Sequence, residues 1–148
     1  MDLILWRHAD AEPGVPDAAR RLTPKGERQA ERVGAWLDRH LPDDTTILAS
    51  PAVRAQQTAL ALGRKFRTVD GIAPGASATA VLAAAGWPGG RGSVLVVGHQ
   101  PSLGEAAALL LAGEEAYWAL KKGAFWWLSR RDHDAAVVLR AALGPDLV

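Results

Sequence analysis

The sequence predicts an α/β fold, a three-layer α/β/α sandwich in which a mostly parallel central sheet lies between two layers of helices. Short apolar runs typical of buried strands alternate with longer segments whose apolar residues recur at helical spacing. The strongest run, Val94-Leu95-Val96-Val97, is rich in β-branched residues and suits the centre of a sheet. The 148 residues are enough for one compact domain, which we expect to span residues 1–148.

The first half of the chain predicts two strands, each followed by a helix. Residues 2–7 form the first buried strand, and a loop with proline and glycine follows over 12–16. Thr23-Pro24 begins a helix, with threonine as the N-cap and proline in the first turn. Its core-facing stripe is Ala30, Val33, Gly34, Leu37 and Leu41, and it ends near Pro42. Residues 46–49 form the second strand, and Ser50-Pro51 repeats the cap-plus-proline start, with Ser50 as the N-cap.

The second half continues the alternation. Residues 66–76 predict a loop with an edge strand over 67–69, and an alanine-rich helix follows over 77–85. A Pro/Gly connection over 88–92 leads into the strand at 94–97 and then into a helix that begins at Pro101. Two final strands, over 124–129 and 136–141, are separated by a turn at 132–134, and this pair can run antiparallel at one edge of the sheet.

Composition and charge exclude several classes of protein. The formal net charge of +1 disfavours a strongly basic nucleic-acid binder. The chain has no cysteine, which excludes disulfides and thiolate metal sites and fits a reducing compartment. No apolar stretch reaches membrane-spanning length, and Arg7 interrupts the one candidate for a signal sequence. We therefore expect a cytoplasmic protein that binds neither nucleic acid nor membrane.

Polar residues follow three of the predicted strands. Arg7-His8 ends the first strand, Ser50 ends the second with Arg54 one turn into the next helix, and His99 follows the strand at 94–97. The carboxyl ends of parallel strands share one edge of a sheet, so these side chains are expected to converge. Two arginines, two histidines and two helix N-termini together predict an anion site, with phosphate as the expected anion.

Four segments, in this order, resemble the histidine phosphatase superfamily and within it the SixA-type phosphohistidine phosphatases: residues 5–12 (LWRHADAE), 21–30 (RLTPKGERQA), 50–59 (SPAVRAQQTA) and 97–103 (VGHQPSL). The resemblance implies a phosphoglycerate mutase-like fold. It also implies that His8 is the nucleophile that becomes phosphorylated, and that Arg7, Arg54 and His99 bind the phosphoryl oxygens. Neither a metal nor another cofactor is required by this chemistry.

Two departures from the family pattern bear on the substrate. Ala9 stands where many members have glycine, and alanine would be strained if that position needs a positive φ. Larger members carry an acid in the middle of the chain that protonates an alcohol leaving group, whereas residues 66–91 contain only Asp70 as a carboxylate. The absence of a recognisable acid in this part of the chain favours a substrate with a P–N bond, such as phosphohistidine. Asp10 and, less favourably, Glu12 are the candidates to replace that acid.

The sequence thus predicts a metal-independent phosphatase that acts through a phosphoryl-histidine intermediate on a phosphohistidine phosphotransfer domain. A small phosphate monoester is the alternative substrate, with Asp10 or Glu12 as the acid. An inactive phosphoprotein-binding module and a mutase are two further hypotheses. Arg21 is a further candidate for the phosphate site; the alternative is that it forms a salt bridge within its loop. The chain lacks the long insertions that cover the pocket in sugar-phosphate mutases, so we expect an open site.

Other features have plainer interpretations. Ser50 has no Gly-x-Ser-x-Gly elbow around it, so a serine hydrolase is disfavoured. The glycines at 89–92 lack the lysine and spacing of a P-loop. His40 and His133 lie in polar settings and are not expected to take part in chemistry. The tryptophans at 118, 126 and 127 are expected to pack in the core and at its edge, rather than form a stacking platform.

Overall fold

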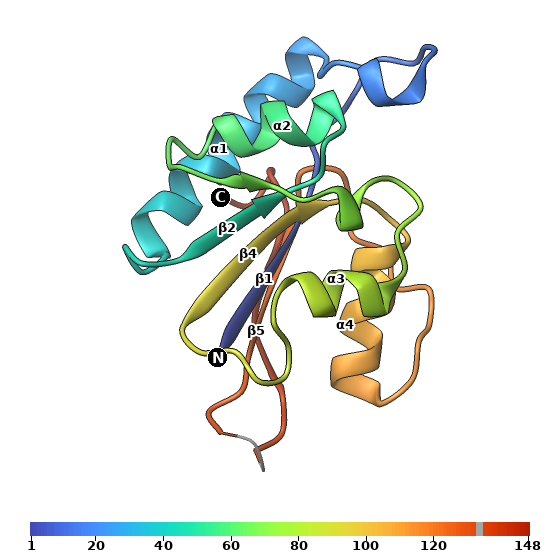
Figure 1. Ribbon diagram of the computed structural model, residues 1–148. Helices are drawn as coiled ribbons and strands as arrows, with labels where there is room; N and C mark the ends of the chain where they lie inside the picture. Colours follow the sequence, from blue (N-terminus) through green and yellow to red (C-terminus); the bar gives the residue numbers. More distant parts are fainter. Residues whose placement is uncertain (133–134) are drawn as a thin grey trace.

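A computed structural model describes residues 1–132 and 135–148 and contains a six-stranded sheet between two pairs of helices (Figure 1). The strand order is β3-β2-β4-β1-β5-β6. The strands are β1 (Asp2–Arg7), β2 (Thr46–Ala49), β3 (Arg67–Thr68), β4 (Ser93–Gly98), β5 (Phe125–Ser129) and β6 (Val138–Leu143). The helices are α1 (Pro24–His40), α2 (Val53–Leu60), α3 (Ala78–Ala84) and α4 (Ser102–Ala112), with short 3-10 turns η1 (Asp17–Ala19) and η2 (Asp70–Ile72).

The sheet is parallel from β3 to β1 and antiparallel at β5 and β6. Successive side chains of a strand point to opposite faces of the sheet, so each central strand contributes side chains to the hydrophobic cores on both faces. Leu3 and Leu5 face α3 and α4, whereas Ile4 and Trp6 face α1 and α2. All six residues of β4 are buried, as expected for a β-branched run at the centre of a parallel sheet. The predicted α/β/α layering and the antiparallel closing pair are confirmed.

The predicted start of the second helix is wrong by two residues. Ser50 is not the N-cap of this helix. α2 begins at Val53, and its N-cap residue is Ala52, whose side chain makes no capping hydrogen bond. The Ser50 hydroxyl instead accepts a hydrogen bond from the Ala52 amide at 3.2 Å and is hydrogen-bonded to the ring of His99. The last strand, β6, begins two residues later than predicted. The predicted turn at 132–134 includes two residues, among them His133, that lie outside the described residues.

A glycine fixes the distance between α1 and the loop that follows β1. Thr23 caps α1 by accepting from the Gly26 amide at 2.9 Å. A Cβ on Gly26 would collide with the backbone carbonyl of Asp10, so only glycine permits this approach. The side chain of Thr23 also donates to the Asp10 carboxylate at 2.8 Å. These contacts hold the start of α1 against the residues that follow the carboxyl end of β1.

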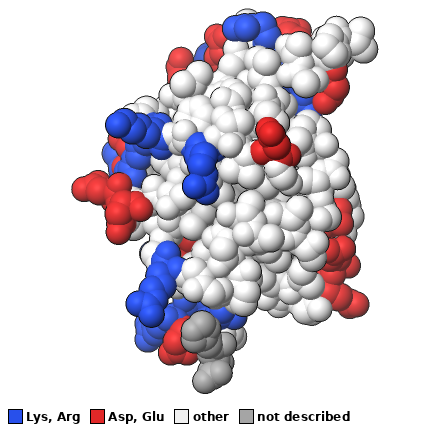
Figure 2. Space-filling view, viewed as in Figure 1, with Lys and Arg blue, Asp and Glu red and all other residues white. Residues whose placement is uncertain are grey.

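Charged side chains are unevenly spread over the surface. On the face shown in Figure 2, most of the lysines, arginines, aspartates and glutamates stand towards the margins, and a broad area of the face is uncharged. Within the described ranges, no helix has both the length and the apolar character needed to cross a membrane.

Candidate active site

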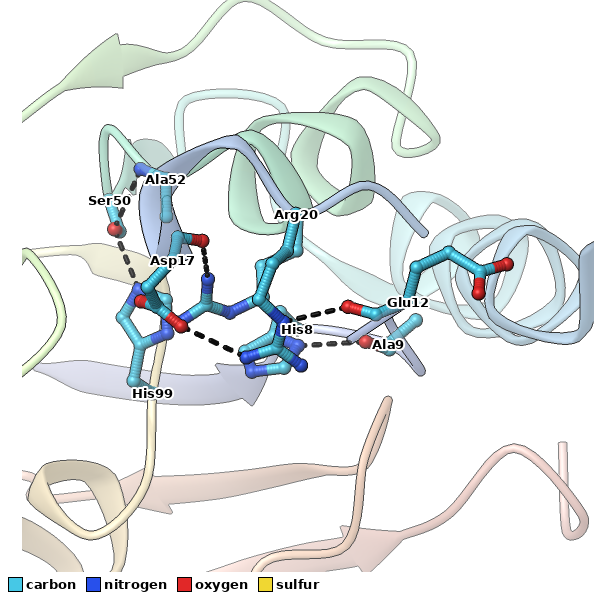
Figure 3. Close-up of polar contacts among 9 residues, drawn as sticks. His8, Ala9, Glu12, Asp17, Arg20, Ser50, Ala52 and His99 are labelled. Carbon is cyan, nitrogen blue, oxygen red and sulfur yellow. Dashed lines mark hydrogen bonds and ion pairs between the residues drawn. The ribbon is translucent and has the colours of Figure 1, made fainter. Parts of the chain in front are cut away.

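The carboxyl ends of β2, β4 and β1 bring three polar residues together. The strand order puts His99, which follows β4, between Ser50 and His8. The backbone amides of His8 and Ser50 donate to the carbonyls of Gly98 and Val97, each at 3.0 Å, which fixes both residues against β4. The rings of His8 and His99 are 5.2 Å apart between centroids, and Figure 3 shows them side by side. The structure therefore brings two histidines to one edge of the sheet.

One hydrogen bond sets the tautomer of His8. Nδ1 lies 2.7 Å from the carbonyl oxygen of Ala9, which can only accept, so Nδ1 carries the proton. Nε2 is then left with a lone pair. Ala9 itself is unstrained, because no residue other than glycine has a positive φ in the described part of the chain. Its amide donates to Thr58 at 3.1 Å, and its side chain is fully buried. Alanine thus suits this position as it is built here.

Burial and positive charge keep both histidines neutral. His8 and His99 are 7% and 4% exposed. Burial lowers the pKa of His8 to about 4, and the charges of Arg54, Arg7 and Arg20 add to this effect. The pKa of His99 is lowered to about 3, mainly by burial and then by His8 and Arg54. His8 is therefore unprotonated at neutral pH, which is the state that a histidine nucleophile requires.

Three nitrogens around these rings have unmet hydrogen-bonding capacity. In the described chain, the buried side-chain nitrogens without a partner are Nε of Arg7, Nε of Arg54 and Nδ1 of His99. Other nitrogens of these side chains are held: Nη1 of Arg7 donates to the carbonyl of Leu120 at 2.8 Å, and Nε2 of His99 lies 2.7 Å from the Ser50 hydroxyl. Buried polar atoms are seldom left unpaired in proteins, and such atoms commonly mark a ligand site.

The loop after β1 contributes two residues that the sequence did not single out. Asp17 accepts from Arg54, through its backbone carbonyl at 2.9 Å and its carboxylate at 3.1 Å. Arg20 donates to the same carboxylate at 3.0 Å and to the carbonyl of Glu12 at 2.7 Å. Figure 3 shows Asp17 and Arg20 beside the two histidine rings. Asp17 therefore takes up part of the hydrogen-bonding capacity of the Arg54 guanidinium.

The remaining sequence candidates lie away from the two rings. Arg21 is exposed and lines a hollow within the loop after β1, together with Glu12 and Arg20. Asp10 is bound to Lys122 at 3.0 Å and to Thr23, which together lower its pKa. The carboxylate of Glu12 points away from His8 in Figure 3. Asp70 lies in the exposed turn η2.

The site is more covered than the sequence suggested. Although the chain lacks long insertions, Asp17 and Arg20 pack close to His8 and His99, which are almost fully buried. The absence of insertions therefore did not leave the site open, because the loop over residues 8–23, between β1 and α1, covers it. The structure brings no group of three or more histidine, aspartate or glutamate side chains together at metal-binding geometry in the residues it describes.

Replacing Asp17 by asparagine is expected to tighten the binding of inorganic phosphate. The change frees Arg54 and removes a negative charge beside the pocket. Because Asp17 is 57% exposed, we expect the inhibition constant to fall by about three- to tenfold rather than more. Competitive inhibition by orthophosphate measures it. Asp38→Asn, which removes a similarly exposed partner of Arg64, is the control and should change nothing. An unchanged constant in Asp17→Asn would contradict the competition between Asp17 and the anion.

The two histidines also make stability depend on pH. Their pKa values are lower in the folded protein than the value of about 6.5 expected when unfolded. Between pH 6.5 and 4 the unfolded chain therefore binds more protons, and the free energy of unfolding falls as the pH drops, by up to about 1.4 kcal/mol per pH unit for each histidine. Denaturant unfolding at pH 7 and pH 5 measures this change. Between these pH values the free energy of unfolding should fall less in the double variant His8→Gln/His99→Gln than in the wild type. Equal losses would show that other groups titrate.

Comparison with known proteins finds relatives of this chain. Residues 3–73 match the family model of the histidine phosphatase superfamily (branch 1). A phosphohistidine phosphatase SixA homologue of Haemophilus influenzae is 37% identical over 126 residues, which cover 74% of this chain and 77% of the relative. The structure of the protein histidine phosphatase SixA complexed with tungstate has a TM-score of 0.84 and 25% identity, covering 99% of this chain and 98% of that one. A phosphoserine phosphatase of Entamoeba histolytica shares the fold, with a TM-score of 0.71, 18% identity and 95% of both chains covered.

Proposed function

Because this chain belongs to the histidine phosphatase superfamily, in its SixA-like branch, and is therefore a phosphatase, we propose that it hydrolyses phosphohistidine on proteins through a phosphorylated His8. The observation that carries the proposal is the set of unpartnered nitrogens on Arg7, Arg54 and His99 around a neutral histidine. Three donors near one nucleophile suit a tetrahedral oxyanion. Tungstate, bound by the SixA relative, is such an anion.

In the first step of the proposed mechanism, Nε2 of His8 attacks the phosphorus atom. The hydrogen bond from Nδ1 to the Ala9 carbonyl holds the ring in the tautomer that leaves Nε2 free. A new P–N bond forms at His8 while the P–N bond of the substrate breaks. If the substrate ring carries a proton on its other nitrogen, it leaves as neutral imidazole. Phosphoryl transfer from this form therefore needs no proton from the enzyme.

In the second step, water attacks the phosphorylated His8. The P–N bond breaks, its electron pair returns to Nε2, and orthophosphate leaves with both protons of the water. In the proposed mechanism Arg7 and Arg54 neutralise the phosphoryl oxygens in both steps. His99 can donate from Nδ1 when the Ser50 hydroxyl donates to its Nε2. No metal is needed to offset the phosphoryl charge where fixed cations do so.

The electrostatics of the site favour a P–N bond over an ester. An alkoxide leaves poorly unless an acid protonates it. The pKa of Asp17 is lowered by its hydrogen bonds to Arg20 and Arg54, and that of Asp10 by Lys122 and Thr23. Both carboxyl groups are therefore ionised at neutral pH and are poor proton donors. Phosphohistidine, whose ring can leave as neutral imidazole, does not require one.

Parallel assays test this substrate assignment. A phosphohistidine peptide, p-nitrophenyl phosphate and a set of sugar phosphates are compared at neutral pH. We expect kcat/KM for the phosphohistidine peptide to exceed that for the sugar phosphates by at least about 100-fold, because the unassisted alkoxide is a poor leaving group. A preference for the sugar phosphates would contradict the proposal. Binding of the peptide without turnover would identify a phosphoprotein-binding module instead.

A further inference from the structure

A basic groove begins at the active-site arginine and runs along α1. It has a volume of about 610 Å³. One side is formed by α1 and the other by the loop between α4 and β5, with Pro145 and Asp146 beside them. Its cationic residues are Arg7, Lys25, Arg28, Arg32, Lys121 and Lys122. We call this surface the basic groove.

The basic groove concentrates positive charge in a chain that is almost neutral. It is lined by six cationic residues and two carboxylates, Asp10 and Asp146, whereas the whole chain has a net charge of +1. Asp10 is already paired with Lys122. The groove is therefore a local region of positive potential, able to attract an acidic partner.

The loop that forms one side of the groove is bonded to the active-site strand. Arg7 donates from its guanidinium to the carbonyl of Leu120 at 2.8 Å, directly before Lys121 and Lys122. The indole of Trp6 donates to the carbonyl of Gly123 at 3.0 Å. Arg7 thus belongs both to the cluster around His8 and to the wall of the groove. A partner in the groove would lie next to the phosphoryl site.

The spacing of the cations indicates the kind of partner. Lys25, Arg28 and Arg32 lie at positions i, i+3 and i+7 on one side of α1, a row about 10 Å long at the helical rise of 1.5 Å per residue. A single phosphate is much shorter than this row. Arg32 donates to the carbonyl of Val148 at 3.1 Å, and Lys122 pairs with Asp10. Lys25, Arg28 and Lys121 are exposed, and none of their side chains makes a hydrogen bond or ion pair with the described part of the chain. They are free to pair with separate carboxylates.

We propose that the basic groove docks an acidic surface of the protein that carries the phosphohistidine. This inference rests on the proposed function and adds the chemistry of the partner: carboxylate side chains on one face, spread over about two helical turns beside the modified histidine. The cluster around His8 recognises the phosphoryl group, which is the same on every phosphohistidine. The groove would select among the proteins that present it, mainly by speeding association.

A charge-reversal variant tests the groove: Lys25→Glu/Arg28→Glu/Lys121→Glu. Its control is Lys65→Glu/Arg67→Glu/Arg91→Glu, which changes the net charge equally at exposed residues outside the groove. The substrates are a phosphorylated histidine phosphotransfer domain with an acidic surface and free phosphohistidine. For the groove variant we expect kcat/KM to fall by about 30-fold or more on the domain, and by less than about threefold on free phosphohistidine. Its dependence on ionic strength should also weaken.

Several results would overturn the groove proposal. An equal fall on both substrates would indicate a damaged active site, and an equal fall in the control would indicate an effect of net charge alone. A loss for a bisphosphorylated sugar but not for the domain would assign the groove to a small polyanion. If the wild type hydrolyses neither phosphohistidine substrate, the proposed function fails. In that case, calorimetric measurement of the binding of the unphosphorylated domain still tests the docking proposal. Equal Kd values for the wild type and the groove variant would exclude docking in the basic groove.

Discussion

His8→Ala is expected to lose almost all phosphatase activity, by about 10⁴-fold or more in kcat, as when a nucleophile is removed from other enzymes. Nε2 of His8 is the buried nitrogen whose lone pair is kept free by the bond from Nδ1 to the Ala9 carbonyl. No neighbouring group can replace it, because Nε2 of His99 is engaged by Ser50. Steady-state hydrolysis of a phosphohistidine peptide measures the loss.

His40→Ala is the control for this variant. His40 is exposed at the end of α1, stacked on Trp36, and distant from the site in the fold. Its loss should leave kcat within about twofold, as is usual for exposed positions without a special role. Thermal unfolding of both variants shows whether each is folded. If folded His8→Ala retained a tenth of the wild-type activity, His8 would not be the nucleophile.

Arg54→Ala is expected to lower kcat/KM by about 10²- to 10³-fold, because it removes a preorganised cation from the proposed phosphoryl site. Arg54 is 5% exposed, and among the described residues its Nε has no partner while its other nitrogens bind Asp17. Since the charge of Arg54 also lowers the pKa of His8, this pKa should rise in the variant, which NMR titration of the ring can follow. Arg54→Lys should recover only part of the rate, because lysine lacks the planar fork of donors.

Arg64→Ala is the matched control for Arg54→Ala. Arg64 also pairs with a half-exposed aspartate, Asp38, and also donates to backbone carbonyls, but it ties the end of α1 to the segment after α2. Its loss should lower stability and leave kcat/KM within about twofold. Equal losses of activity in the two variants would contradict a specific role for Arg54.

Much of the site is predictable because it depends on strand ends. Short apolar runs locate β1, β2 and β4, and parallel pairing brings their carboxyl ends to one edge. The positions of His8 and His99 follow from this rule and from the register that pairs Arg7 with Gly98. The alternation of strands and helices likewise predicts the layers. These features depend on local pattern and on a general rule of topology.

The parts that the sequence did not predict depend on contacts between distant segments. Ser50-Pro51 has the local pattern of a helix cap, yet the hydroxyl of Ser50 contacts His99, 49 residues away. Arg20 and Arg21 are adjacent in a loop without periodicity, so the sequence cannot tell which side chain turns inward. The bridge between Ala11 and Leu22, with the bond from Arg20 to the Glu12 carbonyl, decides it in favour of Arg20.

The most direct test of the proposed mechanism is to trap the phosphoryl group on the enzyme. Wild-type protein is mixed with a phosphohistidine peptide and quenched in alkali, which preserves phosphohistidine, and its own peptides are then sequenced by mass spectrometry. We expect an acid-labile phosphoryl group on the peptide that contains His8, and none in His8→Ala. Turnover of the substrate with a phosphoryl group on another residue, or without any on the enzyme, would contradict the mechanism.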